Sequence, residues 1–259
     1  MRNYKIELEN RVAWIRELLR EAHCSGIIFG NSGGKDSALA GIICKMACDD
    51  TVGIIMPCAS NRNYGEDTVD ANAVAKQFSI ETRTVDLTGV RQMLLNELAG
   101  PSCCAADCGD VSSRSDYSHT VTDTAAKNIA PRLRMTTLYA IGQSEGRLVA
   151  GTGNRDELYV GYYTKYGDGG ADFNPIGDLT VGEVYEFLAY LDAPMNIRTK
   201  APSAGLEDGQ TDEKETGILY ADLDEYLLTG YTNPEARAKI EKMHAATEHK
   251  RTGVKIYGV

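Results

Sequence analysis

The most informative segment of the sequence reads Gly30-Asn31-Ser32-Gly33-Gly34-Lys35-Asp36-Ser37. The apolar run before it, residues 26–29, is typical of a buried parallel strand, and residues 38–47 after it are typical of a helix. A glycine-rich turn between a strand and a helix N-terminus offers free backbone N–H groups and roughly half a positive charge. Two adjacent glycines also let the backbone approach phosphate oxygens that a Cβ atom would keep away. The segment therefore predicts a phosphate-binding loop.

The residues inside this loop restrict the class of ligand that it is expected to bind. The carboxylate of Asp36 would repel a bare phosphate, so its presence predicts a Mg²⁺ ion between the two groups. A Walker loop needs Ser or Thr after Gly-Lys, and the dinucleotide fingerprint Gly-x-Gly-x-x-Gly is absent. The remaining pattern, Ser-Gly-Gly-x-Asp-Ser, resembles the pyrophosphate loop of the ATP-pyrophosphatase superfamily, whose members split ATP into AMP and pyrophosphate. The alternative is a turn that only joins a strand to a helix.

Composition places the chain among ordinary globular proteins. Its 259 residues, 42% hydrophobic and 25% charged, fit one large α/β domain or two small ones. No apolar run approaches the roughly 20 residues of a membrane span, and the N-terminus lacks the apolar region of a signal peptide. We therefore expect no membrane contact and a cytoplasmic location. A net charge of −10 without a Lys/Arg run counts against nucleic-acid binding.

Apolar runs and helical periodicity alternate through the first part of the chain. Strands are expected at residues 26–30, 51–56, 80–85 and 147–151, the third nearer a sheet edge. Helices are expected at residues 4–22, 65–78, 88–98, 121–144, 181–191, 215–228 and 234–247. Pro131 should kink its helix or begin a new first turn. This alternation predicts the α/β class, with a doubly wound, Rossmann-like parallel sheet flanked by helices.

Two irregular segments interrupt this pattern. Residues 99–120 show no period, and such a long loop is either a functional lid or a family-specific insertion. They hold Cys103, Cys104 and Cys108, which we interpret as a Cys-rich loop because no second cysteine or histidine pair completes a zinc set. Residues 161–180 mix glycines, acids and aromatic rings, which suits a polar ligand with a flat ring. The alternative for that segment is a plain surface loop.

Six segments, taken in order, resemble the NAD synthetases. They are residues 32–37, the Arg-Leu-Arg-Met of 132–135, the Gly-Thr-Gly-Asn-Arg-Asp-Glu of 151–157, residues 163–172, the Asn-Pro-Ile-Gly-Asp-Leu of 174–179, and the Glu-His-Lys-Arg of 248–251. The similarity runs from about Gly30 to Arg251, and Thr-Lys-Tyr-Gly-Asp-Gly-Gly at 164–170 is its most specific part. The resemblance implies an adenine nucleotide alpha hydrolase-like fold and a homodimer.

The resemblance also implies roles for individual residues. ATP is expected at Gly30, Asn31, Ser32, Gly33, Gly34, Lys35, Asp36, Ser37, Thr152 and Ser203. Mg²⁺ is expected at Asp36 and Glu157. Deamido-NAD, the nicotinic acid dinucleotide, is expected at Arg132, Lys165, Asp172, His249 and Lys250. The catalytic set is then Asp36, Glu157 and Asp172, where Asp172 orients either the ammonia or the dinucleotide.

The sequence departs from the family pattern at two positions. Val181 stands where the family usually has a Lys that contacts an ATP phosphate, and Ser203 replaces a Thr but keeps its hydroxyl. We hypothesise that Lys35, inside the loop, supplies the missing charge. Only 29 residues precede Gly30, too few for the glutaminase domain of glutamine-dependent relatives. We therefore expect a single domain over residues 1–259 and free ammonia as the nitrogen source.

The implied activity is a ligase that converts deamido-NAD, ATP and ammonia into NAD, AMP and pyrophosphate through an acyl adenylate. This reaction is the last step of NAD biosynthesis. One alternative is another adenylating amidotransferase of the superfamily, such as a GMP synthetase-like enzyme, against which residues 165–172 argue. A second is a non-catalytic nucleotide-binding module, favoured by Val181 but opposed by the retention of both Asp36 and Glu157.

Overall fold

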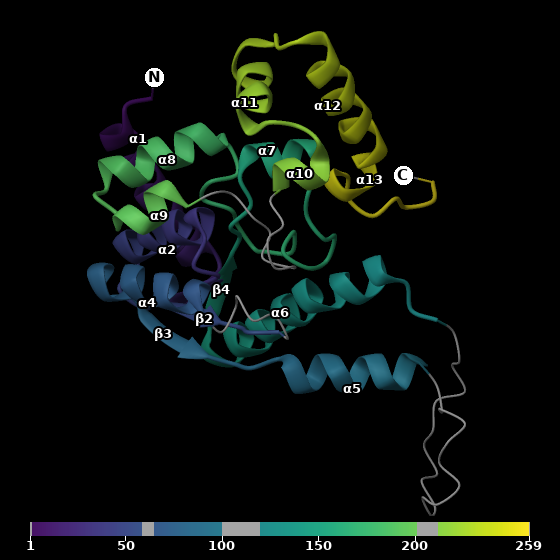
Figure 1. Ribbon diagram of the computed structural model, residues 1–259. Coiled ribbons are helices and arrows are strands. Elements are labelled where there is room, and N and C mark those ends of the chain that lie inside the picture. The colour runs from purple at the N-terminus through teal and green to yellow at the C-terminus, as the bar shows by residue number, and fades with distance from the viewer. Residues whose placement is uncertain (1, 59–64, 100–119, 201–211, 259) are drawn as a thin grey trace, which may run out of the picture.

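The computed structural model describes residues 2–58, 65–99, 120–200 and 212–258 (Figure 1). Within these ranges the sheet has the strand order β3-β2-β1-β4, and every neighbouring pair is parallel. The strands are β1 (Gly26–Gly30), β2 (Thr51–Ile55), β3 (Glu81–Thr84) and β4 (Arg147–Ala150). The predicted parallel sheet is confirmed, and β3 lies at an edge as expected.

Helices cover both faces of this sheet (Figure 1). One face packs against α1 (Tyr4–Glu21), α2 (Lys35–Ala47), α4 (Glu66–Phe78) and α8 (Val181–Tyr190). The other packs against α6 (Asp123–Glu145), which α5 (Thr88–Ala99) accompanies. Because side chains alternate along a strand, Ile27 and Phe29 enter the first core and Ile28 the second. The doubly wound arrangement is therefore confirmed.

The Phe29 ring explains how the strand before the phosphate loop is fixed. A Cβ atom at Gly41 of α2 would lie 2.4 Å from Cζ of Phe29, and one at Gly53 of β2 would lie 3.0 Å from it. The two glycines thus make room for a fully buried ring between strand and helix. Burial of a ring of this size contributes about 1.5–3 kcal/mol. It packs the end of β1 against the middle of α2, the helix that begins at the loop.

Two helices differ from the sequence expectation for local reasons. α6 continues through Pro131, which is buried inside it, and ends at Gly146 in the left-handed conformation. The helix expected at residues 215–228 is confirmed over α11 (Tyr220–Thr229), but its expected start is wrong. Residues 215 and 216 belong to a separate short helix, α10 (Asp212–Thr216), and Gly217 between the two helices has a φ of +66°. No helix in the described ranges is both long and apolar enough to cross a membrane.

The C-terminal part forms a smaller apolar cluster beside the sheet (Figure 1). It joins α7 (Arg155–Val160) and α11 to α12 (Pro234–Ala246), and α13 (Glu248–Arg251) follows. Asn233 caps α12 by accepting a hydrogen bond from the Ala236 N–H at 2.8 Å, as the Asn-Pro start predicts. Sequence periodicity missed the short helices α9 (Met195–Thr199) and α13. Helices of four or five residues are too short to show a period.

Candidate active site

The predicted phosphate loop lies at the carboxyl ends of two neighbouring strands. The loop follows β1, and the segment with Thr152 follows β4, whose Ala150 pairs with Phe29 of β1. The chain leaves β1 toward β2 on one side, whereas β4 lies on the other side. This reversal is a topological switch point, where open α/β sheets bind ligands. The structure therefore brings Ser32 and Thr152 to the same edge, as predicted.

The loop takes its shape from Gly33 and from contacts with α4. Gly33 has a φ of +74°, and a Cβ atom there would lie 2.1 Å from the carbonyl oxygen of Asp67. The Asn31 side chain donates a hydrogen bond to the carbonyl oxygen of Ala71 at 3.3 Å. On the other side, the hydroxyls of Ser32 and Ser37 lie 3.0 Å apart. The loop is thus held by α4 behind it, and Gly34 caps α2 at the anion-binding end.

Lys35 and Asp36 begin α2 and form an ion pair of 2.7 Å between Nζ and Oδ2. The Lys35 ammonium is buried and lies 5.9 and 5.8 Å from the ring centroids of Tyr185 and Tyr220. Burial alone would lower the pKa of Lys35, but the charges of Asp36 and Glu157 outweigh burial and raise that pKa. The ammonium therefore stays charged inside the site.

Asn154 joins the two carboxylates that were predicted to bind metal. Its side-chain N–H donates to Oδ1 of Asp36 at 3.0 Å. Its backbone N–H donates to Oε2 of Glu157 at 3.1 Å, and its Oδ1 accepts from the Glu157 N–H at 3.0 Å. These last two bonds form the capping box of α7. Burial, followed by the charge of Asp36, raises the pKa of Glu157 well above its ordinary value.

The residue pair fits a Mg²⁺ ion that is shared with a phosphate ligand. In the described part of the chain, no group of three or more His, Cys, Asp or Glu side chains is arranged to hold a metal. Protein Mg²⁺ sites commonly use one or two carboxylates, with phosphate oxygens and waters as the other ligands. Asp36 and Glu157 offer two carboxylates close enough for one to shift the pKa of the other.

Three of the residues predicted for deamido-NAD come together at the C-terminus. The Lys165 ammonium donates to the carbonyl oxygen of His249. The Lys250 ammonium donates to the carbonyl oxygens of Gly161 and Tyr163, at 2.6 Å each. These bonds attach α13 to the segment that follows α7. Sequence periodicity gave no sign of this contact, because it joins residues more than 80 positions apart.

The 164–170 turn packs against α6 beside Arg132. A Cβ atom at Gly167 would lie 3.1 Å from the backbone carbon of Pro131, and one at Gly170 would lie 3.0 Å from Cγ of Met135. The glycines of the most specific segment thus allow the turn to approach the helix closely. Arg132 itself lies on an exposed position of α6. The structure therefore places Arg132 next to the turn that carries Lys165.

Asp172 is fixed at the edge of the sheet. Its Oδ2 accepts from the Val149 N–H at 2.8 Å, and its Oδ1 accepts from the Tyr139 hydroxyl at 3.0 Å. The carboxylate thus orients a strand end and a tyrosine of α6, a role that the sequence did not indicate. Ser203, Cys103, Cys104 and Cys108, together with nearly all of the 99–120 segment, lie outside the described residues.

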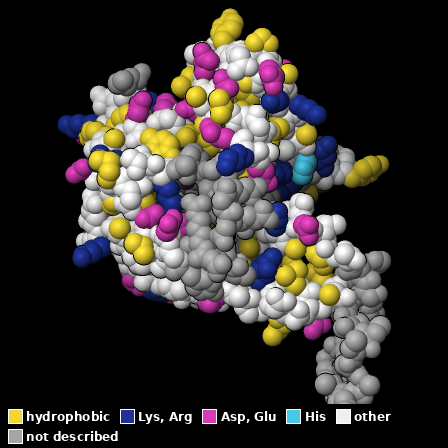
Figure 2. Space-filling view, in the orientation of Figure 1, with side chains coloured by type: hydrophobic (Ala, Val, Ile, Leu, Met, Phe, Trp, Pro, Cys, Tyr) yellow, Lys and Arg dark blue, Asp and Glu magenta, His cyan; other side chains and the backbone are white. Residues whose placement is uncertain are grey.

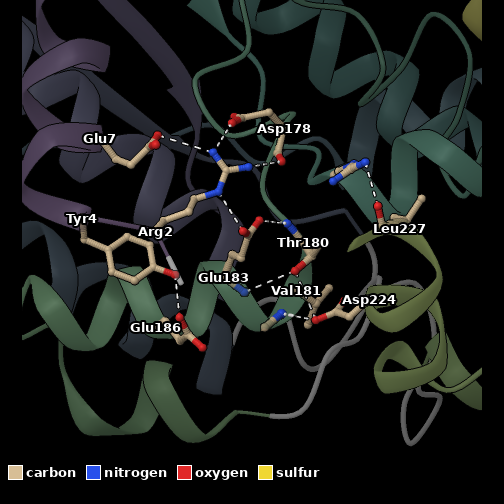
Figure 3. Close-up of polar contacts among 12 residues, drawn as sticks. Arg2, Tyr4, Glu7, Asp178, Thr180, Val181, Glu183, Glu186, Asp224 and Leu227 are labelled. Atoms are coloured by element: carbon tan, nitrogen blue, oxygen red, sulfur yellow. Dashed lines mark hydrogen bonds and ion pairs between the residues drawn. The ribbon is translucent and has the colours of Figure 1, made fainter. Parts of the chain in front are cut away.

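Val181, where the family pattern has Lys, is buried at the start of α8 (Figure 3). Its N–H donates to Oδ2 of Asp156 at 2.8 Å, while the Gly182 N–H donates to Oδ2 of Asp224 at 2.8 Å. Two carboxyl groups therefore cap this helix terminus. Burial, followed by the charge of Asp224, raises the pKa of Asp156 to about 8. In the same view, Arg2 binds Asp178 and Glu183 and thereby ties the N-terminal segment to α8.

The family match, the related sequences and the solved structures agree on one protein family. Residues 7–254 match the NAD synthase family. The chain is 44% identical to the NH(3)-dependent NAD(+) synthetase of Carboxydothermus hydrogenoformans, over 96% of each chain. Among solved structures it resembles the NMN synthetase of Francisella tularensis (TM-score 0.88, 31% identity, all of both chains). It also resembles the NH3-dependent NAD synthetase of Campylobacter jejuni, solved with a nitrate ion (TM-score 0.73, 25% identity, 98% and 99% of the chains).

These matches also confirm the adenine nucleotide alpha hydrolase-like fold that the sequence resemblance implied. They support the NAD synthetase interpretation and do not support the GMP synthetase-like alternative. The relatives are named as enzymes, which also argues against a non-catalytic nucleotide-binding module. Because the family match covers residues 7–254 and a relative is 44% identical over 96% of each chain, the chain belongs to the NAD synthase family.

Proposed function

We propose that this chain is an ammonia-dependent NAD synthetase, which converts deamido-NAD, ATP and ammonia into NAD, AMP and pyrophosphate. The observation that carries this proposal is the convergence of Asp36 and Glu157 on Asn154, directly beside the phosphate loop. A module that only binds nucleotides has no need for a second carboxylate at that position. The 44% identity to an NH(3)-dependent NAD(+) synthetase supports the same conclusion.

In the first step, a carboxylate oxygen of the nicotinic acid ring attacks the α-phosphorus of ATP, and the bond to the β-phosphate breaks. This step brings two anions together. The loop amides and the N-terminus of α2 would stabilise the phosphates, and Lys35 adds a buried positive charge in the same place. Asp36 and Glu157 would hold Mg²⁺, which neutralises phosphate charge when bound.

In the second step, ammonia attacks the acyl carbon of the adenylate, AMP leaves and one proton is lost. Water must be kept away because it would hydrolyse the adenylate. Lys165 lies on the segment after α7, which contacts His249 and Lys250 of α13, and Arg132 lies beside the turn of that segment. We propose that these residues and Asp172 bind deamido-NAD. Asp172 would act from a fixed position, since two hydrogen bonds already orient it.

A second candidate substrate is the acid mononucleotide, which would be converted into NMN by the same chemistry. The observation that favours it is the likeness to the Francisella tularensis NMN synthetase, whose TM-score of 0.88 exceeds the 0.73 of the Campylobacter jejuni NAD synthetase. The two acids share the pyridine carboxylate, but the mononucleotide lacks the AMP half of the dinucleotide. The ratio of kcat/KM for the two acids, measured with saturating ATP and ammonium, separates the candidates.

We also propose that ammonia is the direct nitrogen source and that residues 1–259 form one domain. We further propose that the chain acts as a homodimer. Support for the dimer comes from α5, which has no buried residue although it carries Val90 and Met93, 52% and 69% exposed. Hydrophobic side chains gather over the ends of α5 and α6 on the face shown in Figure 2. Sedimentation of wild type and of Met93→Glu tests the dimer. The cytoplasmic location stays a prediction.

The proposed activity is tested by incubating the protein with ATP, Mg²⁺, ammonium and deamido-NAD. NAD, AMP and pyrophosphate should form in equal amounts. Replacing deamido-NAD by a purine acceptor should give no AMP. Replacing ammonium by glutamine should give no NAD if ammonia is used directly.

A further inference from the structure

Lys200, which follows α9, reaches back to the phosphate loop. Its Nζ lies 3.2 Å from the carbonyl oxygen of Gly33, 2.8 Å from Oδ1 of Asp67 and 2.6 Å from Oδ2 of Asp70. The side chains of the lysine and the two aspartates are 16%, 11% and 13% exposed. One largely buried ammonium therefore connects α9, the first turns of α4 and the loop itself.

The contact with Gly33 fixes a particular peptide group. The carbonyl of Gly33 and the N–H of Gly34 belong to one planar trans peptide, so they point in opposite directions. Lys200 holds the carbonyl oxygen, while the Gly34 N–H lies 3.3 Å from Oγ of Ser32. Gly34 is the N-cap of α2, and the N–H groups of such a terminus are the ones that bind anions.

This peptide group needs an external tether. Gly33 has a φ of +74° and is followed by a second glycine, so its backbone has more accessible conformations than that of other residues. A hydrogen bond from an ammonium to the Gly33 carbonyl selects one of them. The aspartates hold the ammonium in place, since each makes an ion pair with it.

We propose that Lys200 is a positioning residue for the phosphate loop, which it orients for ATP without contacting ATP. Each of its three N–H groups already has an oxygen acceptor, and two aspartates more than balance its charge. The ammonium is therefore a poor candidate for a direct phosphate ligand. That ATP is the ligand rests on the proposed function. That Lys200 holds the loop in one conformation concerns the protein without nucleotide.

The test uses Lys200→Met, which keeps the aliphatic stem, together with Lys200→Arg and Asp70→Asn. Arg198→Met is the matched control, because Arg198 lies on α9 two residues before Lys200 and pairs with the exposed Asp192 at 3.8 Å. Two quantities are measured: hydrogen exchange of the amides of residues 32–35 without nucleotide, and the calorimetric Kd for α,β-methylene-ATP with Mg²⁺. Melting temperatures identify any variant that fails to fold.

Lys200→Met is expected to speed exchange in the loop and to weaken binding of the analogue by about tenfold, since a charged hydrogen bond is lost. Lys200→Arg should restore most of the affinity, and Arg198→Met should match wild type. Asp70→Asn should also weaken binding, because the ammonium loses an anchor. A direct phosphate contact predicts the opposite for Asp70→Asn, which would release the lysine and tighten binding.

Unchanged loop exchange and unchanged affinity in Lys200→Met would overturn the proposal, and so would tighter binding in Asp70→Asn. If Lys200→Met does not fold, Lys200→Arg and Asp70→Asn still decide between the two roles. If wild type does not bind the analogue, the proposed function fails. The exchange measurement then tests Lys200 by itself.

Discussion

Lys35 and Asp36 are neighbours in the sequence, and the buried Lys35 ammonium pairs with the partly buried Asp36 carboxylate, with 2.7 Å between Nζ and Oδ2. The charge of Glu157, the other carboxylate of the site, also raises the pKa of the Lys35 ammonium. A cation is thus already present beside the loop that we propose binds the triphosphate. Val181, at the position where the family pattern has a lysine, is buried and uncharged. This arrangement supports the hypothesis that Lys35 supplies the phosphate charge.

Lys35→Gln should therefore raise the KM for ATP by about tenfold or more, because the site loses a buried charge next to the phosphates. The KM for deamido-NAD should change little. Lys45→Gln is the control, since Lys45 lies in the last turn of the same helix and donates a hydrogen bond to the nearby backbone carbonyl of Asp49. Steady-state kinetics measures both constants. An unchanged KM for ATP in Lys35→Gln would remove this lysine from the phosphate site.

Asp36→Ala and Glu157→Gln should each lower kcat by about 10²–10³, since each removes a group expected to stabilise transition-state charge through Mg²⁺. Raising the Mg²⁺ concentration should recover part of the activity of Glu157→Gln. Glu97→Gln, a change on an exposed position of α5, is the control. Normal kcat at saturating substrate in Asp36→Ala would show that this carboxylate binds no catalytic metal.

Gly33→Ala should weaken ATP binding and lower the melting temperature. The new Cβ atom would lie 2.1 Å from the carbonyl oxygen of Asp67, so the loop or α4 must move. The left-handed φ adds strain of about 1 kcal/mol or more. Gly89→Ala is the control, because nothing lies within 4 Å of its Cβ position in α5. That change should leave activity unchanged; wild-type ATP affinity in Gly33→Ala would contradict the described loop conformation.

The pH dependence of stability should reflect Asp178. Burial opposes ionisation of its carboxyl group, but the hydrogen bond from Arg11 and the charges of Arg11 and Arg2 lower its pKa below the ordinary value. Its stabilising effect is therefore complete above the unfolded-state pKa, about 3.9, and is lost as pH falls through the lower native value. Urea unfolding should show Asp178→Asn to be less stable than wild type at pH 7.

Because Asp178 is about half exposed, that loss should be no more than about 1 kcal/mol, and it should shrink below pH 4. Asp192→Asn is the control, since its side chain is 90% exposed and its nearest cation is 3.8 Å away. Its stability should follow that of wild type at every pH. A loss in Asp178→Asn that stays constant down to pH 2 would contradict the lowered pKa.

β1 and β2 could be predicted from the sequence because buried parallel strands are short apolar runs, whereas β3 is a polar edge strand. The phosphate loop could be predicted because its glycines, serines and aspartate are consecutive. β1 has the predicted bounds, and β2 and β4 each end one residue earlier than predicted. The helix expected at 215–228 begins only at Tyr220, because Gly217 takes a left-handed conformation that apolar spacing does not reveal.

Contacts between distant residues could not be predicted from the sequence alone. Asn154 is an example: its spacing from Glu157 signals a capping box, but nothing local indicates its bond to Asp36. The same holds for Lys200, which binds Gly33 across 167 positions. Both contacts depend on how strands and helices pack, and that packing determines the electrostatics of the site.

We propose that this site activates a pyridine carboxylate with ATP and then transfers ammonia to it. The most direct measurement is a single incubation with ATP, Mg²⁺, deamido-NAD and ¹⁵N-ammonium, followed by mass spectrometry of the dinucleotide and quantification of AMP and pyrophosphate. We expect ¹⁵N in the amide of NAD, one AMP and one pyrophosphate per NAD, and almost no product with Asp36→Ala. Formation of ADP and phosphate, or the absence of labelled amide from either the dinucleotide or the mononucleotide acid, would contradict it.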